Sequence, residues 1–172
     1  IGASEIGEIK NLCRIAKPTS GIITNIGKAH LEGFGSFEGV IKAKTELYHF
    51  LKENNGTQFV NQDDNLLIKK SDEESRITYG KESSSDFTTE FTSSFPFISV
   101  TIKDTLINSN LVGEFQYDNI VAASCIGNFY NISYKNIKKS IEENITKKVI
   151  NNWVGPYCCV YRFTSGEFHT AI

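Results

Sequence analysis

The N-terminal part of the sequence alternates between short apolar segments and segments with helical periodicity. The predicted strands are Ser20–Thr24 and Thr57–Asn61, and the predicted helices are Glu5–Ala16, Phe37 to about Asn54, and Gln62–Ser71. Strands and helices that alternate in this way are typical of a parallel sheet with helices on its faces. This order constrains the fold more than any other feature, and it predicts the α/β class.

The pattern changes after Ser71. Three short segments alternate between apolar and polar residues, and serine- and aspartate-rich connections separate them: Arg76–Gly80, Phe97–Lys103 and Thr105–Leu111. Such segments are typical of antiparallel strands and hairpins. Two helices are predicted after them, Tyr117–Tyr130 and Tyr134–Asn144. We therefore expect a small antiparallel subsheet beside the parallel sheet.

Composition and charge exclude several classes of function. A net charge of −2 provides no basic surface for nucleic acid. No apolar run approaches the roughly 20 residues that cross a bilayer, and the first residues do not read as a signal peptide. The four cysteines (Cys13, Cys125, Cys158 and Cys159) have no zinc-site spacing, so we expect buried, reduced thiols in a cytoplasmic protein.

One lysine lies on the apolar side of the predicted helix that starts at Phe37. The apolar residues of this stripe are Phe37, Val40, Ile41, Leu47, Tyr48 and Leu51. At about 100° per residue, Lys44 lies near the centre of the stripe and Lys42 points away from it. A buried ammonium costs several kcal/mol unless it is paired or neutralised. Four explanations stay open: Lys44 extends to the surface, pairs with a carboxylate, loses its charge, or takes up CO₂ to form a carbamate that holds Mg²⁺.

The loop from Thr24 to Ser36 follows the carboxyl end of a predicted strand, where open α/β sheets bind their ligands. It contains Asn25, His30 and three glycines. His30 is either a metal ligand or general base, or a loop histidine bonded to a backbone carbonyl. A turn between His30 and Lys44 would bring both side chains to one metal ion, which makes this loop the candidate site.

Several segments resemble the central, ATP-binding domain of the Mur ligases. They are GASEIGEI from Gly2, TNIGKAHLEGFGSFEGVIKAKTELYHFL from Thr24, FVNQDD from Phe59 and LVGEFQYDNIVAA from Leu111. The resemblance implies a mostly parallel, Rossmann-like sheet flanked by helices, with a small antiparallel subsheet. It implies a partial domain over residues 1–145, because the family's N-terminal phosphate loop is absent. Residues 146–172 remain an unassigned tail, either a pair of terminal strands or sequence that a frameshift made foreign to the fold.

The resemblance also implies roles for particular residues. The family's histidine in Thr-Asn-x-x-x-Ala-His falls on His30, a Mg²⁺ ligand, and its carbamylated lysine in Ala-Lys-x-Glu falls on Lys44. The family's adenine-contacting asparagine, six residues after a glycine, falls on Asn119, for which a capping or surface role is the alternative. Asn61 and Asp64 match an Asn-Ala-Asp-Asp motif, in which a structural role is favoured over a catalytic one. The expected cofactor-binding residues are Asn25, Asn61, Asp64 and Asn119.

Within the family, the sequence is most similar to the member that adds a dipeptide. This implies an ATP- and Mg²⁺-dependent carbon–nitrogen ligase of peptidoglycan synthesis, monomeric and cytoplasmic. Its substrates would be UDP-N-acetylmuramoyl-tripeptide and D-alanyl-D-alanine, joined through an acyl phosphate. Because the sequence starts at Ile1 and contains no methionine, we expect a fragment that is inactive by itself.

Two alternatives remain open. The first is that the chain belongs to another ligase, either a sister Mur ligase or a folylpolyglutamate synthase-like enzyme. The second is that it is a non-catalytic module or a gene remnant. One departure bears on the adenine site: family members usually have His-Asn where this sequence has Phe115 and Gln116.

Overall fold

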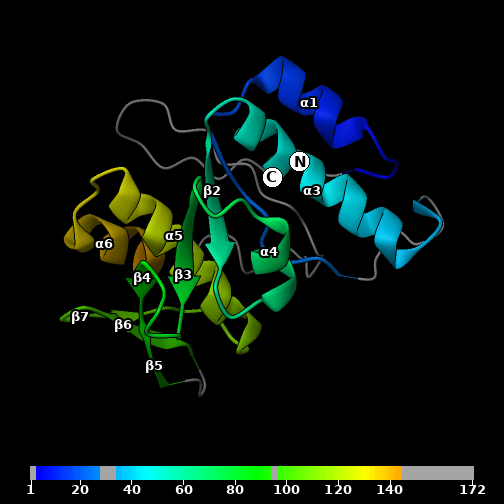
Figure 1. Cartoon of the computed structure of the whole chain (residues 1–172). Coiled ribbons are helices and arrows are strands. Elements are labelled where there is room, and N and C mark those ends of the chain that lie inside the picture. Colours follow the sequence, from blue (N-terminus) through cyan, green and yellow to red (C-terminus); the bar gives the residue numbers. More distant parts are fainter. Residues whose placement is uncertain (1–2, 28–33, 94–96, 145–172) are drawn as a thin grey trace. The chain divides into compact units, whose positions relative to one another are not determined.

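The structure, a computed structural model, describes residues 3–27, 34–93 and 97–144, which form two compact units (Figure 1). The first unit holds the described residues up to Val60 together with Asp64–Ile77. The second holds Asn61–Asp63 and the described residues from Thr78 onward. Each unit is described by itself below.

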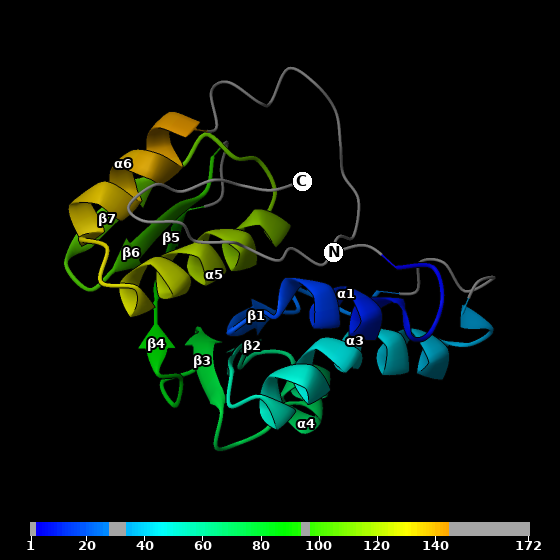
Figure 2. The same ribbon diagram turned by 90° about the horizontal axis from the view of Figure 1, so that it is seen from above.

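The first unit follows the predicted alternation of helix and strand. Its elements are α1 (Glu8–Ala16), β1 (Ser20–Ile22), α3 (Phe37–Glu53), β2 (Thr57–Asn61, whose last residue is counted with the second unit) and α4 (Asn65–Lys70). β1 pairs with β2 in parallel, with Gly21 opposite Gln58. Helices α1 and α3 lie side by side (Figure 2). The α/β class is therefore confirmed for this part of the chain.

Helix α3 begins and ends where its sequence provides caps. The Ser36 hydroxyl accepts a hydrogen bond from the Gly39 amide at 3.1 Å, which satisfies one of the free N–H groups of the first turn. At the other end, Asn55 takes a left-handed conformation with a φ of 53°, and the Gly56 amide donates to the Leu51 carbonyl at 2.7 Å. An asparagine or glycine in this conformation is a common way to end a helix.

The core of the first unit lies between the two helices and the strands. Ile9 and Cys13 of α1 pack with Leu47 and Leu51 of α3, and all four are at most 2% exposed. Gly21 lets β1 approach this layer, because a Cβ there would lie 3.0 Å from both leucine side chains. Burying one leucine or isoleucine side chain stabilises the folded state by about 1.5–3 kcal/mol. This packing fixes which face of α3 points inward.

Four strands form a sheet with the order β1-β2-β3-β4. β3 (Arg76–Gly80) pairs with β4 (Phe87–Thr88) in parallel, with Tyr79 opposite Phe87. The prediction that Arg76–Gly80 belongs with the antiparallel strands is therefore wrong. An alternating pattern shows that one face of a strand is buried, but it does not specify the strand's partner, which long-range hydrogen bonds decide.

The antiparallel subsheet is confirmed for the other two predicted segments. It contains β5 (Glu90–Ser93), β6 (Ser99–Ile102) and β7 (Thr105–Asn108), in that order. β6 and β7 form a hairpin in which Ile102 lies opposite Thr105. Helices α5 (Phe115–Phe129) and α6 (Tyr134–Asn144) complete the second unit, and α6 packs on β7.

The cysteines that the structure describes, Cys13 and Cys125, carry buried thiols, as predicted. Burial raises the pKa of the Cys125 thiol to about 12, because the surrounding apolar atoms disfavour the thiolate. Cys158 and Cys159 lie outside the described residues. None of the described helices has the length and hydropathy needed to span a bilayer.

Candidate functional site

Lys44 lies on α3 among buried neighbours, and its amine reaches a polar group at the end of β1. Ala43, Leu47 and Tyr48 beside it are at most 1% exposed, whereas Lys44 itself is half-buried. Its Nζ donates a hydrogen bond to the backbone carbonyl of Asn25 at 2.8 Å. The predicted orientation of Lys44 is confirmed, and Lys42 is exposed, as expected.

Asn25 takes part in this contact through its backbone. It lies three residues beyond the last residue of β1, at the carboxyl end of the strand, and its side chain is exposed. The carbonyl of Asn25 is therefore one partner that holds the Lys44 amine. His30 lies outside the described residues, so its approach to Lys44 stays a prediction.

A modified Lys44, if present, would add donors for a metal ion. Among residues 3–27, 34–93 and 97–144, no three His, Cys, Asp or Glu side chains are grouped to hold a metal ion. A carbamate at Lys44 would supply oxygen atoms, the ligand type that Mg²⁺ prefers. It would also retain one N–H, which matches the hydrogen bond that Lys44 donates to Asn25.

The polar residues after β2 have structural partners. The Asn61 side-chain oxygen accepts from the Asp63 amide at 3.0 Å, and Asn61 is only 6% exposed. Asp64 caps α4 by accepting from the amides of Leu66 and Leu67 at 2.9 and 3.1 Å. These contacts agree with the structural roles favoured from the sequence. Cofactor binding by Asn61 and Asp64 stays a prediction.

Two substitutions of Asp64 separate capping from cofactor binding. We expect Asp64→Asn to leave the unfolding free energy nearly unchanged, because the amide oxygen can still accept both hydrogen bonds. Asp64→Ala removes the cap and should lower it by about 1 kcal/mol. Urea denaturation of the unmodified chain and of the two variants measures both effects. A loss of nucleotide affinity in Asp64→Asn at unchanged stability would instead assign the carboxylate to the cofactor.

Asp63, between these two residues, has a contact that the sequence analysis missed. Its carboxylate accepts from the amides of Lys81 at 3.0 Å and Glu82 at 3.3 Å, in the turn that follows β3. At Gly80, a Cβ would lie 2.8 Å from the same carboxylate, so glycine is required there. The two adjacent aspartates of the motif could have indicated a role for Asp63. Only the folded structure identifies the hydrogen-bond partners of each aspartate.

Asn119 lies in the first turns of α5, and its side chain is exposed. Its side-chain N–H donates to the Gln116 side-chain oxygen at 3.0 Å. Gln116 stands at one of the two positions where the sequence departs from the family pattern.

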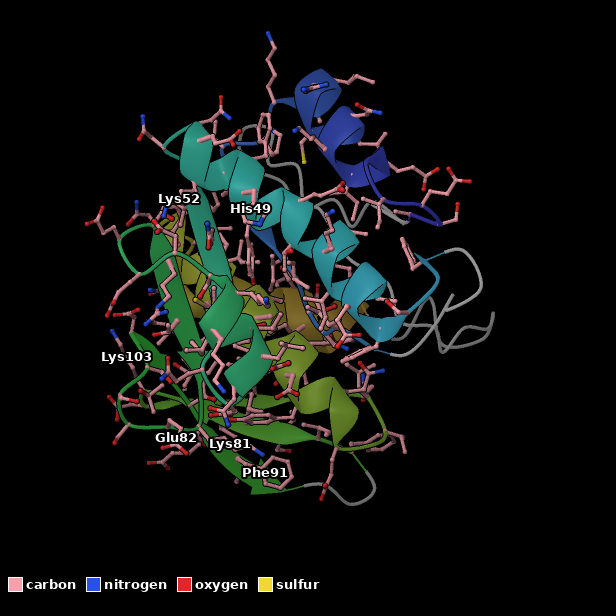
Figure 3. The ribbon with its side chains drawn as sticks, turned by 45° about the vertical axis from the view of Figure 1, so that its right-hand side comes forward. His49, Lys52, Lys81, Glu82, Phe91 and Lys103 are labelled. Atoms are coloured by element: carbon pink, nitrogen blue, oxygen red, sulfur yellow. The ribbon has the colours of Figure 1, made fainter. Side chains whose placement is uncertain are left out.

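The first turns of α5 also carry Tyr117, which is packed under a cation. The Lys81 ammonium lies 4.7 Å from the Tyr117 ring centroid. It also lies 5.6 Å from the ring centroid of Phe91, which is labelled beside it in Figure 3. The Tyr117 hydroxyl and the Thr89 side-chain hydroxyl share a hydrogen bond of 2.5 Å. Burial raises the pKa of Tyr117, so this residue stays a neutral phenol. These contacts fix the helix turn that carries Asn119.

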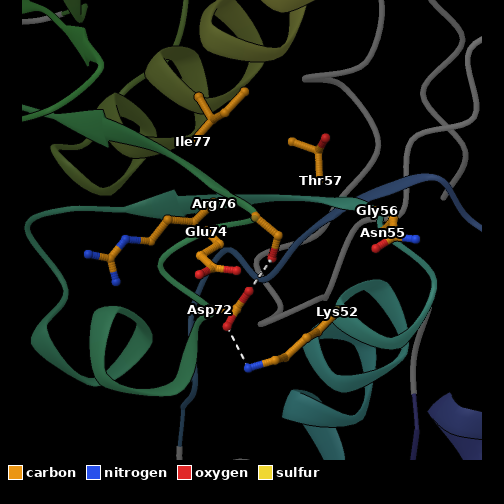
Figure 4. A pocket seen from close by; sticks show the side chains of 9 residues that line it. Lys52, Asn55, Gly56, Thr57, Asp72, Glu74, Arg76 and Ile77 are labelled. Atoms are coloured by element: carbon orange, nitrogen blue, oxygen red, sulfur yellow. Dashed lines mark hydrogen bonds and ion pairs between the residues drawn. The ribbon is translucent and has the colours of Figure 1, made fainter.

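A separate pocket of about 520 Å³ opens where β2 and β3 begin (Figure 4). Lys52 and Asp72 form an ion pair across it at 2.6 Å, and this contact lowers the pKa of the Asp72 carboxyl. The pocket lies at the amino ends of the strands, whereas α/β sheets bind ligands beyond their carboxyl ends. Its position therefore does not support a nucleotide site.

The sequence matches the family model of the Mur ligase middle domain over residues 1–127. It is 30% identical, over 144 residues, to the UDP-N-acetylmuramoyl-tripeptide--D-alanyl-D-alanine ligase of Bacillus subtilis, covering 82% of this chain and 31% of that protein. The Haemophilus influenzae ligase of the same name is 42% identical over 67 residues, which are 39% of this chain and 14% of the relative. The chain thus spans at most about a third of these relatives.

Solved structures give the same result. MurF from Acinetobacter baumannii superimposes with a TM-score of 0.70 at 25% identity, over 83% of this chain and 33% of that one. MurF ligase from Thermotoga maritima in complex with ADP gives 0.63 at 27% identity, over 82% of this chain and 34% of that one. These neighbours support the mostly parallel sheet with its antiparallel subsheet.

Proposed function

The chain belongs to the Mur ligase family, through its middle domain, and we propose that it is the ATP-binding part of a ligase that joins D-alanyl-D-alanine to UDP-N-acetylmuramoyl-tripeptide. The observation that carries this proposal is the Lys44 amine, held by the Asn25 carbonyl at the carboxyl end of β1. The named relatives support the choice of substrates. We place the complete ligase in the cytoplasm as a monomer.

The reaction would proceed in two steps. The γ-phosphoryl group of ATP passes to the terminal carboxylate of the tripeptide, giving an acyl phosphate and ADP. The amine of the dipeptide then attacks the acyl carbon, an amide bond forms, and phosphate leaves with the loss of a proton. Bound Mg²⁺ would supply electrostatic stabilisation of the charge on the transferring phosphoryl group.

Lys44 would act as a carbamate. Its neutral amine takes up CO₂ and loses a proton, which gives an anion whose oxygen atoms, together with His30, would hold Mg²⁺. The Asn25 carbonyl would keep the nitrogen in place before and after the change.

Substrate-dependent phosphate release tests the proposed function. The complete ligase that carries this sequence is assayed with ATP, Mg²⁺ and UDP-N-acetylmuramoyl-tripeptide, and then with D-alanyl-D-alanine or single amino acids. We expect release only with the dipeptide. Release with glutamate and a folate acceptor would indicate a folylpolyglutamate synthase, and no release with any acceptor would indicate a non-catalytic module.

Asn119 would recognise the adenine base. We expect Asn119→Leu to weaken ATP binding by about tenfold, because a pair of side-chain hydrogen bonds to a base contributes roughly 1–3 kcal/mol. Isothermal titration of the complete ligase measures the affinity. Asn136→Leu, an exposed asparagine of α6, serves as the control and should not change it. Equal affinities in all three proteins would contradict the assignment.

A further inference from the structure

Glu46, which is close to Lys44 in the sequence, forms hydrogen bonds to a part of the chain far from it in the sequence. It lies two residues after Lys44 on α3, and its two oxygen atoms accept from the amides of Gly7 at 2.6 Å and Lys10 at 2.9 Å. These amides are at the start of α1, where backbone N–H groups have no partner inside the helix. A carboxylate at this end of a helix forms charge-assisted hydrogen bonds and interacts favourably with the helix dipole.

Helix α1 depends on this contact for its cap. Its N-cap residue is Gly7, with a φ of 96° and no side chain to accept a hydrogen bond. The preceding turn is held by Glu8, whose carboxylate accepts from the amides of Ser4 at 2.6 Å and Glu5 at 3.1 Å. Glu46 therefore links this turn to α3.

The turn before α1 packs on the same buried cluster as the residue that follows Asn25. Ala3 packs against the cluster of Phe34, Val40 and Ala43, and Ile26 packs against the same cluster. Ile26 follows Asn25 directly in the chain, and the Asn25 carbonyl accepts from Lys44. One set of contacts thus connects Glu46, the start of α1 and the exit of β1.

We propose that Glu46 is a positioning residue for Lys44: by capping α1 it holds Ala3 against the cluster on which Ile26 also packs, and so fixes the Asn25 carbonyl that orients the lysine amine. The functional meaning of this role rests on the proposed function, but the position of the amine does not. Lys44 and Glu46 are both part of the Ala-Lys-x-Glu motif. The motif therefore contains both the lysine and the carboxylate that caps α1.

Competitive amine labelling tests the proposal. The full chain is treated with trace acetic anhydride in CO₂-depleted buffer, at a temperature where circular dichroism shows every variant to be folded. Peptide mass spectrometry then gives the labelling of Lys44 relative to Lys70, an exposed lysine of α4. Glu46→Ala should raise this ratio by about fivefold, the factor expected for one net hydrogen bond.

Two further variants complete the design. Glu46→Gln keeps one acceptor oxygen and should give a smaller rise, and it remains available if Glu46→Ala does not fold. Glu53→Gln changes a carboxylate on the same helix, in the same groove beside α1, and should leave the ratio unchanged. Amide hydrogen exchange at Gly7 and Lys10 reports the cap itself.

The outcomes are distinct. Faster exchange at Gly7 and Lys10 together with a higher Lys44 ratio supports the proposal. Faster exchange with an unchanged ratio overturns it, because the cap would then be structural only, and no change in either measurement overturns it as well. Failure to detect a Lys44 carbamate in ¹³C-bicarbonate would count against the proposed function alone, since the labelling needs neither CO₂ nor metal.

Discussion

Replacing Lys44 with methionine is expected to lower the kcat of the complete ligase by a factor of about 10²–10³, the range seen when one preorganised electrostatic group is removed from an active site. Methionine has a similar length and suits the apolar neighbours of this position. It cannot donate to the Asn25 carbonyl, and it cannot take up CO₂. The fold should therefore be retained while the anion is lost.

The control for this prediction is on the same helix. Lys42→Met changes an exposed lysine on the other side of α3 and should leave kcat nearly unchanged, because this side chain takes no part in the proposed site. The unfolding midpoints of both variants are measured to verify that they fold. A Lys44→Met ligase with normal turnover, unaffected by added bicarbonate or acetate, would remove the basis of the proposed function.

Replacing Gly39 with alanine is expected to destabilise the first unit by about 1–3 kcal/mol, the usual cost of overpacking a core. A Cβ at this position would lie only 2.1 Å from the Phe34 backbone oxygen and 3.0 Å from its carbon. Phe34 is 8% exposed and packs with Val40 and Ala43, so it cannot move without loosening that cluster.

Helix propensity makes the opposite prediction, which sharpens this test. Alanine is favoured over glycine inside a helix by about 1 kcal/mol, so propensity alone would make Gly39→Ala stabilising. Denaturant unfolding of the chain decides the sign. Glu38→Ala, at the exposed neighbouring position, should change stability by no more than about 0.5 kcal/mol. A more stable Gly39→Ala chain would show that the Phe34 backbone adjusts freely.

The candidate site was only partly accessible from the sequence. Helical periodicity placed Lys44 on the inward side of α3, and this is confirmed by its buried neighbours. Periodicity could not supply its partner, because the Asn25 carbonyl is 19 residues away in the chain. Backbone groups leave no trace in a residue pattern, so contacts of this kind require the folded structure.

What the sequence determined by itself is local. Helix α3 begins after its predicted cap, Ser36, and α6 covers the predicted residues Tyr134–Asn144. Periodicity, caps and turn residues act over a few positions, so each can be read along the chain. The order of these segments was also sufficient for the α/β class.

What only the tertiary structure decided depends on contacts between distant segments. β3 joins the first sheet rather than the antiparallel one, and Glu46 caps a helix that starts 38 residues before it. Asp63 holds the turn after β3, whereas its neighbour Asp64 caps α4. These two adjacent aspartates have different hydrogen-bond partners, because hydrogen bonds and burial depend on which backbone groups the fold brings within reach.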